Sequence, residues 1–366
     1  MKDFAYFMPT KILFGKDCII NNSNILKDTG NKAMVVTGRK SAKINGAEKD
    51  VIFALEKENI KYIIFDEIEE NPDVETIVKA SEIGKKEKVD FIIGIGGGSP
   101  MDAAKAISCL VANPDCTEEI LLGEQKKHLP VIEVPTTSGT GSEVTPLSVL
   151  TFHKEKTKYS INQKIFAKCT FLDAKYTESL SPKITNNTAI DALSHIIEGY
   201  MAVKSSFFSD IIAEAALRLF KECIPCIENR EYTFENREKL LICSTIAGIL
   251  IAQTGTSLPH FFGYQLTYNK HIAHGAANGM LMTSYLKLFG EDKKVSNILN
   301  ILGMKNIEEL QKFFKKSLKE YYDIKFTLEE IDMYTDNSYL KKEKLKTFPY
   351  DISKEDIKNV YIESLI

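Results

Sequence analysis

Four short apolar runs divide the first half of the chain, and each is rich in β-branched residues. They lie at residues 33–37, 62–65, 91–95 and 131–134. Continuous apolar runs of this length are typical of parallel strands whose two faces are both covered. Helical stretches separate them, as after 71–75, where Asn71 would cap a helix that has Pro72 at its first position. Repeated strand–helix–strand units predict a doubly wound, Rossmann-like parallel sheet.

From about Ser181 onward the strand pattern fades and apolar residues recur at helical spacing. One such stripe, expected to face a core, consists of Ile211, Ile212, Ala215, Ala216, Leu219 and Phe220. The longest apolar stretch, 240–252, is interrupted by Ser244, Thr245 and Gly248. It is shorter than the ~18–20 residues that a membrane span needs, so it predicts a buried core helix. The sequence thus predicts an α/β domain over residues 1–178 and an all-α domain over residues 179–366.

Composition narrows the function without identifying it. The chain has 366 residues with 44% apolar and 27% charged residues, an ordinary globular balance for about two domains. A net charge of −3, with acids interleaved among the lysines, disfavours a nucleic-acid binder. The first residues lack the apolar core of a signal peptide, so we expect no leader.

The seven cysteines are odd in number and irregularly spaced, which predicts reduced thiols and a cytoplasmic location. Cys223 and Cys226 form a single C-x-x-C pair in a helical context. Without a second pair it does not support a zinc ribbon, and a redox dithiol is the minor interpretation.

Two loops that follow predicted strands have the composition of a nucleotide site. Residues 96–100 (GGGSP) lead into a helix, whose N-terminal amides and positive dipole end attract anions. Residues 135–143 (PTTSGTGSE) are dense in hydroxyls and glycines. The first loop is not the G-x-G-x-x-G fingerprint and could be merely a tight turn, but two such loops from neighbouring strands could hold a pyrophosphate and a ribose.

The helical half contains a candidate metal site. Asp191 and His195 are four residues apart, so on a helix their side chains lie on one face. Three of the six histidines, His260, His271 and His274, fall within fifteen residues. His260 and His274 could fold back on the helix that carries Asp191 and His195. One carboxylate and these three imidazoles would suit Fe²⁺ or Zn²⁺, and the alternative is that the histidines lie at the surface or cap helices.

Four motifs, in order and spacing, resemble those of the iron-containing (group III) alcohol dehydrogenases, with 1,3-propanediol and butanol dehydrogenase-like members the most similar. They are GGGSPMDAAK (96–105), PTTSGTGSE (135–143), DALSHIIEGY (191–200) and HGAANGM (274–280). The resemblance spans essentially the whole chain. It implies the two-domain fold shared with dehydroquinate synthase, with cofactor and metal meeting between the domains.

The resemblance also implies the roles of individual residues. Asp191, His195, His260 and His274 match the metal ligands. Gly97, Gly98, Ser99 and Asp102 match the pyrophosphate loop, Thr136, Thr137 and Ser142 match the second cofactor loop, and Lys158 matches a lysine that reaches the cofactor. Many members have a second histidine at the position of Tyr264. Tyr264 and His271 are the two candidates for a proton relay, and the alternative for His271 is a hydrogen bond that supports a metal ligand.

The implied reaction is hydride transfer between a small primary alcohol or diol and NAD(P), with the metal polarising the alcohol or carbonyl oxygen. A dehydroquinate synthase-like lyase or a glycerol(-phosphate) dehydrogenase would share the fold. Those enzymes handle anionic substrates, whereas Phe261, Phe262 and Tyr264 beside His260 favour a neutral alcohol. A non-catalytic nucleotide- or metal-binding protein is the remaining alternative. A homodimer is expected from the resemblance.

The residues after the first predicted strand indicate a preference for NADP(H) over NAD(H). An acidic residue at this kind of position binds the ribose 2′-hydroxyl of NAD and repels a 2′-phosphate. Members of the resembled family that prefer NAD look to have Asp at the residue that follows this strand. This chain has Gly38 at that position, followed by Arg39 and Lys40. Glycine leaves room for the phosphate, and the cations could pair with it; the alternative is a solvated basic turn.

Overall fold

The computed structural model describes residues 3–153 and 157–366, which form two compact units. Of the described residues, those between 8 and 179 make the first unit, and residues 3–7 with 180–366 make the second. Residues 3–7 lie in the helical unit, whereas the predicted α/β domain begins at residue 1. Gln253 holds them in the helical unit, because its side chain bonds the backbone N–H (3.3 Å) and C=O (2.9 Å) of Phe7.

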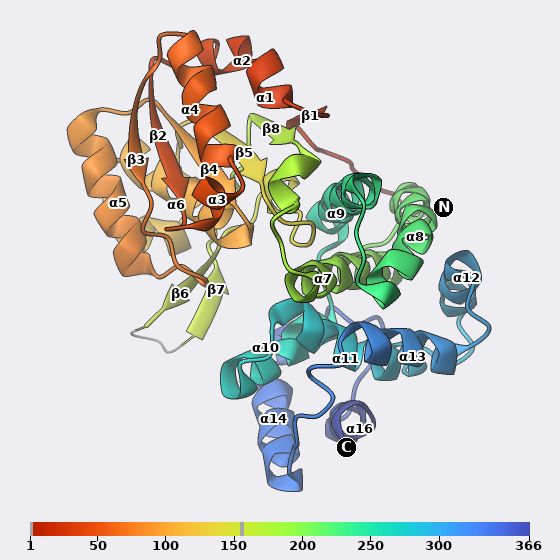
Figure 1. The fold of residues 1–366 in the computed structure, drawn as a ribbon. Coiled ribbons are helices and arrows are strands. Elements are labelled where there is room, and N and C mark those ends of the chain that lie inside the picture. Colours follow the sequence, from red (N-terminus) through yellow and green to blue (C-terminus); the bar gives the residue numbers. More distant parts are fainter. Residues whose placement is uncertain (1–2, 154–156) are drawn as a thin grey trace. The chain divides into compact units, whose positions relative to one another are not determined.

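The α/β unit is built on one parallel sheet of six strands in the order β1-β8-β5-β4-β2-β3 (Figure 1). The strands are β1 (Lys11–Phe14), β2 (Lys32–Thr37), β3 (Lys61–Phe65), β4 (Phe91–Gly96), β5 (Val131–Pro135) and β8 (Cys169–Leu172). A separate antiparallel hairpin joins β6 (Val149–Phe152) and β7 (Thr157–Ser160). The four predicted strands are confirmed as β2 to β5. The strands β1 and β8 were not predicted from the sequence.

Helices cover both faces of this sheet. They are α1 (Cys18–Asn21), α2 (Asn24–Lys27), α3 (Ser41–Ile44), α4 (Ala47–Lys57), α5 (Val74–Glu87) and α6 (Gly98–Ala112), with short 3₁₀ turns at Glu118–Leu122, Ser142–Val144 and Ala174–Thr177. Along β2, Ala33 and Val35 pack in the core under α4, whereas Met34 and Val36 pack in the core under α5 and α6. Both faces of β2, β4 and β5 are buried, which explains their continuous apolar runs, whereas the edge strand β3 is partly exposed.

The start of α5 corrects one prediction. The residue that caps the helix is Asp73, whose carboxylate accepts the N–H of Thr76 at 2.6 Å. Asn71 lies outside the helix in the left-handed conformation (φ 59°), and its N–H is donated to Ser99 Oγ at 3.1 Å. Asn71 and Pro72 therefore belong to the loop at the end of β3, at the same edge of the sheet as the two glycine-containing loops.

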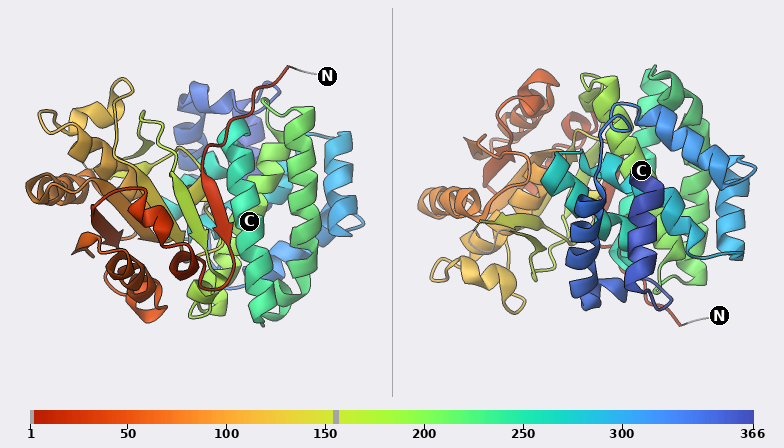
Figure 2. Two further views of the ribbon diagram at one scale, coloured as in Figure 1. Left: turned by 90° about the horizontal axis from the view of Figure 1, so that it is seen from above. Right: turned by 90° about the horizontal axis from the view of Figure 1, so that it is seen from below.

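The second unit is entirely helical in the part of the chain that the structure describes. Its helices are α7 (Pro182–Met201), α8 (Phe207–Asn229), α9 (Phe234–Thr254), α10 (Leu258–Lys270), α11 (His274–Lys287), α12 (Lys293–Leu302), α13 (Ile307–Ser317), α14 (Leu328–Leu340), α15 (Lys342–Leu345) and α16 (Lys354–Leu365). Helix α7 packs against α8, α9 and α11, and Figure 2 shows α14 and α16 side by side. The predicted fold class, a Rossmann-like α/β domain followed by an all-α domain, is confirmed.

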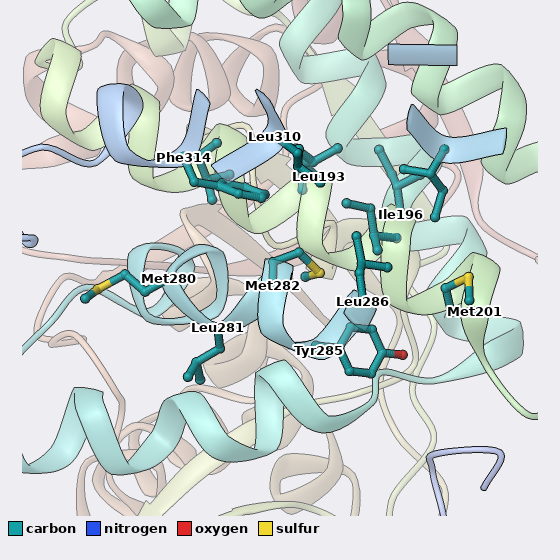
Figure 3. Close-up of a cluster of buried hydrophobic side chains, with 14 of the residues drawn as sticks. Leu193, Ile196, Met201, Met280, Leu281, Met282, Tyr285, Leu286, Leu310 and Phe314 are labelled. Atoms are coloured by element: carbon teal, nitrogen blue, oxygen red, sulfur yellow. The ribbon is translucent and has the colours of Figure 1, made fainter. Parts of the chain in front are cut away.

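The core of the helical unit is apolar and continuous. Figure 3 shows Leu193 and Ile196 of α7 facing Met282 and Leu286 of α11, with Phe314 of α13 beside them. The predicted stretch 240–252 lies within α9, where most of its apolar side chains are buried. Among the described helices no single one is long and apolar enough to cross a membrane. Helices α9 and α10 meet both conditions only when they are taken together, across a 111° bend.

Candidate functional site

Helix α7 carries the first two residues of the predicted metal site. Ser181 caps this helix by accepting the N–H of Ile184, and Pro182 occupies its first turn, where a missing N–H costs nothing. The helix is buried around most of its circumference from Ala189 onward, so the polar side chains of Asp191 and His195 lie inside the protein. A buried carboxylate and imidazole need partners, which the neighbouring helices supply.

Helices α10 and α11 bring the other two residues to Asp191. The Nε2 atoms of His260 and His274 lie 3.7 Å and 3.9 Å from Asp191 Oδ1. The His195 and His260 rings stack with centroids 4.4 Å apart, and the His260 and His274 centroids are 5.1 Å apart. The structure thus brings together all four residues that the sequence singled out, from three helices.

The geometry and chemistry of these residues fit a divalent cation. Donor atoms of Asp191, His195 and His260 lie within 4.8 Å of one another. Two ligands that share one Zn²⁺ at about 2.0–2.2 Å lie at most about 4.4 Å apart, so the 3.7 Å and 3.9 Å separations need little adjustment. Nε2 of His260 is buried and has no hydrogen-bond partner among the described residues. A metal ion would bind the lone pair of this nitrogen.

Glu198, which the sequence analysis missed, orients His260. It lies on α7 three residues after His195 and is fully buried. One oxygen accepts the backbone N–H groups of Ser257 (2.9 Å) and His260 (3.2 Å), and the other bonds His260 Nδ1. A carboxylate that accepts the Nδ1 proton leaves Nε2 as the donor atom toward a metal, as is usual for histidine ligands.

The electrostatics of the cluster favour a cation. Burial by itself raises the pKa of Asp191, but the imidazoles of His195, His274 and His260 face it and bring its pKa below the ordinary value. For His260, burial lowers the pKa, while Glu198 and then Asp191 raise it by more. Two buried carboxylates therefore create a negative environment around the imidazole donors.

The two predicted relay residues differ in position. The ring of Tyr264 stacks on His274 with centroids 5.6 Å apart and is partly exposed. His271 is exposed and adopts the left-handed conformation (φ 53°) that ends α10. The ring contacts recorded for His274 are with His260 and Tyr264.

Phe261 and Phe262 do not support the substrate argument that was based on them. Both side chains belong to the apolar core of the helical unit, and the Phe262 ring packs on Tyr361 with centroids 5.4 Å apart. They are buried because their helix needs an apolar face, so they carry no information about the substrate.

In the α/β unit, the two predicted cofactor loops contact each other. Strands β4 and β5 are paired so that Gly96 lies opposite Pro135, and Thr136 donates its N–H to Gly96 O at 2.8 Å. A Cβ atom on Gly97 would lie 3.3 Å from Thr137 Oγ1. Helix α6 begins at Gly98, so its free amide groups lie at the carboxyl end of β4. This is the arrangement in which α/β sheets bind phosphate groups.

Two of the predicted cofactor residues, Asp102 and Ser142, hold the loops in place. Asp102 accepts hydrogen bonds from Ser142 Oγ (2.6 Å) and Val149 N (2.9 Å). Lys105, which the sequence analysis did not single out, is fully buried and donates to Ser142 O and Oγ at 2.6 and 2.8 Å and to Leu147 O at 2.9 Å. These bonds tie α6 to the second loop, so Asp102 and Ser142 have a structural task in this unit.

Asn71 connects two further predicted residues. Lys158 Nζ donates to Asn71 Oδ1 at 2.8 Å, and Ser99 Oγ accepts the Asn71 N–H. Burial lowers the pKa of Lys158. Asn71 is therefore a candidate cofactor residue that was mistaken for a helix cap.

The predicted selectivity residues follow β2 directly. A Cβ atom on Gly38 would lie 3.2 Å from Ile68 O and 4.0 Å from Ser41 Oγ, so a side chain here requires the Ile68 carbonyl to shift by a few tenths of an ångström. The Arg39 guanidinium is exposed and lies 3.1 Å from a carboxylate oxygen of Glu69. Arg39 thus already has an anionic partner.

The C-x-x-C pair lies in α8, where both thiols are buried. Residues three apart on a helix have Cβ atoms about 5–6 Å apart, whereas a disulfide needs about 3.5–4.5 Å. A bridge between Cys223 and Cys226 would have to distort the helix, so the pair serves as core packing.

Comparisons with known proteins agree with this geometry. The family model described as iron-containing alcohol dehydrogenase matches residues 9–174, and the model described as Fe-containing alcohol dehydrogenase family, C-terminal, matches residues 185–365. A long-chain-alcohol dehydrogenase of Geobacillus thermodenitrificans is 30% identical over 90% of this chain and 88% of its own length. An NADPH-dependent butanol dehydrogenase of Clostridium saccharobutylicum is 29% identical over 89% and 86%. The crystal structure of an iron-containing alcohol dehydrogenase from Thermotoga maritima has a TM-score of 0.91 and 38% identity, covering 99% of both chains.

Proposed function

Because this chain belongs to the iron-containing alcohol dehydrogenase family, we propose that it interconverts small primary alcohols or diols and their aldehydes with NAD(P). The observation that carries the proposal is the convergence of three imidazoles on one buried carboxylate. One imidazole nitrogen, His260 Nε2, is buried there without a hydrogen-bond partner among the described residues. We propose Asp191, His195, His260 and His274 as the ligands of one divalent metal, Fe²⁺ or Zn²⁺.

The residues of the chain prepare this site. A bound divalent metal would act as a Lewis acid toward the alcohol or carbonyl oxygen. Glu198 holds the Nδ1 proton of His260, so that Nε2 is a lone-pair donor. Tyr264 packs against the His274 ring and limits its rotation.

The cofactor would bind at the carboxyl edge of the parallel sheet. We propose that Gly97, Gly98 and Ser99 present the N-terminal amides of α6 to the pyrophosphate. Thr136, Thr137 and Lys158 would contact the cofactor directly. Asp102 and Ser142 would support it through the bonds that fix the second loop.

A panel of alcohols and aldehydes, assayed on metal-reconstituted protein with both NADH and NADPH, tests the proposed reaction. We expect turnover of at least one small aldehyde. Metal and nucleotide binding without turnover of any member would favour a non-catalytic binding protein instead.

A homodimer and a cytoplasmic location complete the proposal. Light scattering on purified protein would measure the mass in solution, and a monomer at micromolar concentration would contradict the dimer. Fractionation of the source cells would test the location.

We predict that NADPH is preferred over NADH by roughly 5- to 100-fold in kcat/KM. Gly38 offers no carboxylate that would repel the 2′-phosphate, and Arg39 and Lys40 could pair with it. Since Arg39 is exposed and already paired with Glu69, the lower part of this range is expected. Comparison of kcat/KM for both cofactors with one aldehyde measures the preference.

The variant Gly38→Asp should move this preference toward NADH, because a carboxylate would accept the ribose hydroxyl and repel the phosphate. Gly123→Asp is the matched control, since Gly123 is exposed and a Cβ there would meet nothing closer than 3.6 Å. Equal efficiencies in the parent, or the same response from both variants, would show that this strand end does not select the cofactor.

Tyr264→Phe tests the proposed proton relay, since phenylalanine keeps the ring on His274 and removes only the hydroxyl. If that hydroxyl transfers the proton, kcat should fall about 100-fold or more. Tyr268→Phe, one turn further along α10 and largely exposed, is the control. His271→Asn, which tolerates the left-handed backbone, tests the other candidate in the same assay. A kcat within twofold of the parent in a variant removes that residue from the mechanism.

A further inference from the structure

We propose that Asn278 is a positioning residue, which holds Asp191 and His274 in the arrangement that a metal ion needs. This inference rests on the proposed metal site and concerns a residue that does not itself bind the metal. Asn278 follows His274 by one turn of α11.

The position of Asn278 brings it into contact with two of the four proposed ligands. It is fully buried on α11, four residues after His274, and therefore on the same face of the helix. Its Nδ2 lies 3.1 Å from Asp191 Oδ1 and 3.4 Å from His274 Nε2. One NH₂ group thus connects α11 with α7.

The orientation of this amide follows from its partners. An ionised carboxylate only accepts hydrogen bonds, so the NH₂ group and not the carbonyl must face Asp191. Because the same group faces His274 Nε2, that nitrogen has to carry a lone pair, with the ring proton on Nδ1. In the metal-free protein Asn278 therefore favours the His274 tautomer whose Nε2 carries the lone pair. A bound metal would take this lone pair in place of the amide hydrogen bond, while the bond from Asn278 to Asp191 would remain.

The packing around the amide prevents it from turning. A Cβ atom on Gly263 of α10 would lie 2.6 Å from Asn278 Oδ1. A Cβ atom on Gly275 would lie 2.0 Å from Asn187 O and 2.7 Å from Asp191 Cβ. Gly263 allows α10 to approach α11 closely, and Gly275 allows α11 to approach α7. These two close approaches confine the amide.

The confinement has an energetic cost, which points to a function. Asn278 Oδ1 is buried and has no hydrogen-bond partner among the described residues. A buried acceptor without a partner destabilises the folded protein. A residue that only filled space could be apolar and avoid this cost, whereas the two contacts of the NH₂ group require an amide.

Cobalt binding tests this inference without depending on turnover. In Asn278→Ala, we expect the Kd for Co²⁺ to increase about 10- to 100-fold, as for other residues that orient metal ligands. The visible absorption bands of the bound Co²⁺ should also change, because the coordination geometry is no longer held. The control is Ser284→Ala, a similar truncation on α11 that removes a hydrogen bond to Ser364.

A second variant covers the case in which the alanine variant does not fold. Asn278→Asp keeps the size of the side chain and replaces the donor by an oxygen, so the Co²⁺ spectrum should again differ from that of the parent. An unchanged Kd and spectrum in the folded variants would overturn the role of Asn278. Failure of the parent protein to bind Co²⁺ at all would instead overturn the proposed metal site.

Discussion

Removal of the divalent metal should abolish turnover and leave the protein folded. Lewis-acid stabilisation of the reacting oxygen accounts for several kcal/mol of the barrier, so kcat should fall about a thousandfold or more. The fold does not depend on the ion, because the helical unit has a continuous apolar core of its own, which includes Leu193, Ile196, Met282 and Leu286 (Figure 3).

Chelation followed by gel filtration, with activity and far-UV circular dichroism measured before and after, checks this expectation. Activity should return when Fe²⁺ or Zn²⁺ is added back. His195→Ala should reproduce the loss of activity. His128→Ala, which changes an exposed histidine of the other unit, should not. Loss of helicity on chelation, or full activity without bound metal, would contradict a catalytic and non-structural ion.

Glu198→Gln should weaken metal binding about 10- to 100-fold. The glutamine carbonyl can still accept the N–H groups of Ser257 and His260, which leaves its NH₂ group against His260 Nδ1. Since that group only donates, Nδ1 must accept, and the ring proton moves to Nε2. A protonated Nε2 has no lone pair for the metal.

Two measurements on the purified variant check this mechanism. Competition with a chromogenic chelator gives the metal affinity, and ¹⁵N NMR of the metal-free protein gives the tautomer of His260. Glu214→Gln is the control, because Glu214 is another helical glutamate, partly buried, whose carboxylate accepts bonds from Tyr200 and Asn297. The mechanism is wrong if Glu198→Gln keeps both the parent affinity and the proton on Nδ1.

The same variant should also lower the thermal midpoint. The Glu198 carboxylate lies at the N-terminus of α10, where a negative charge interacts favourably with the free amides of the first turn. Its loss should cost about 1–3 kcal/mol, because hydrogen bonds to a charged acceptor become bonds to a neutral one. Thermal unfolding of the metal-free parent and variant separates this effect from the loss of metal binding.

The pattern of apolar residues predicted the wrong buried face for α8. The sequence pattern put Ile211 and Ala215 on the core side of α8, but both are exposed, and Ala213 and Leu217 are buried in their place. The helix is apolar over more than half of its circumference, so the pattern allows several rotations. Packing against α7, α9 and α12 selects one of them.

The sequence by itself determined the strands β2 to β5, because short apolar runs rich in β-branched residues, separated by helical stretches, are typical of a parallel sheet. It also determined the pairing of Asp191 with His195, since a helix places residues four apart on one face. Only the tertiary structure decided the residues that support the site. Glu198, Asn278 and Lys105 are polar residues of ordinary helices, and such residues usually face water. Their roles depend on burial between elements distant in sequence, which no local pattern encodes.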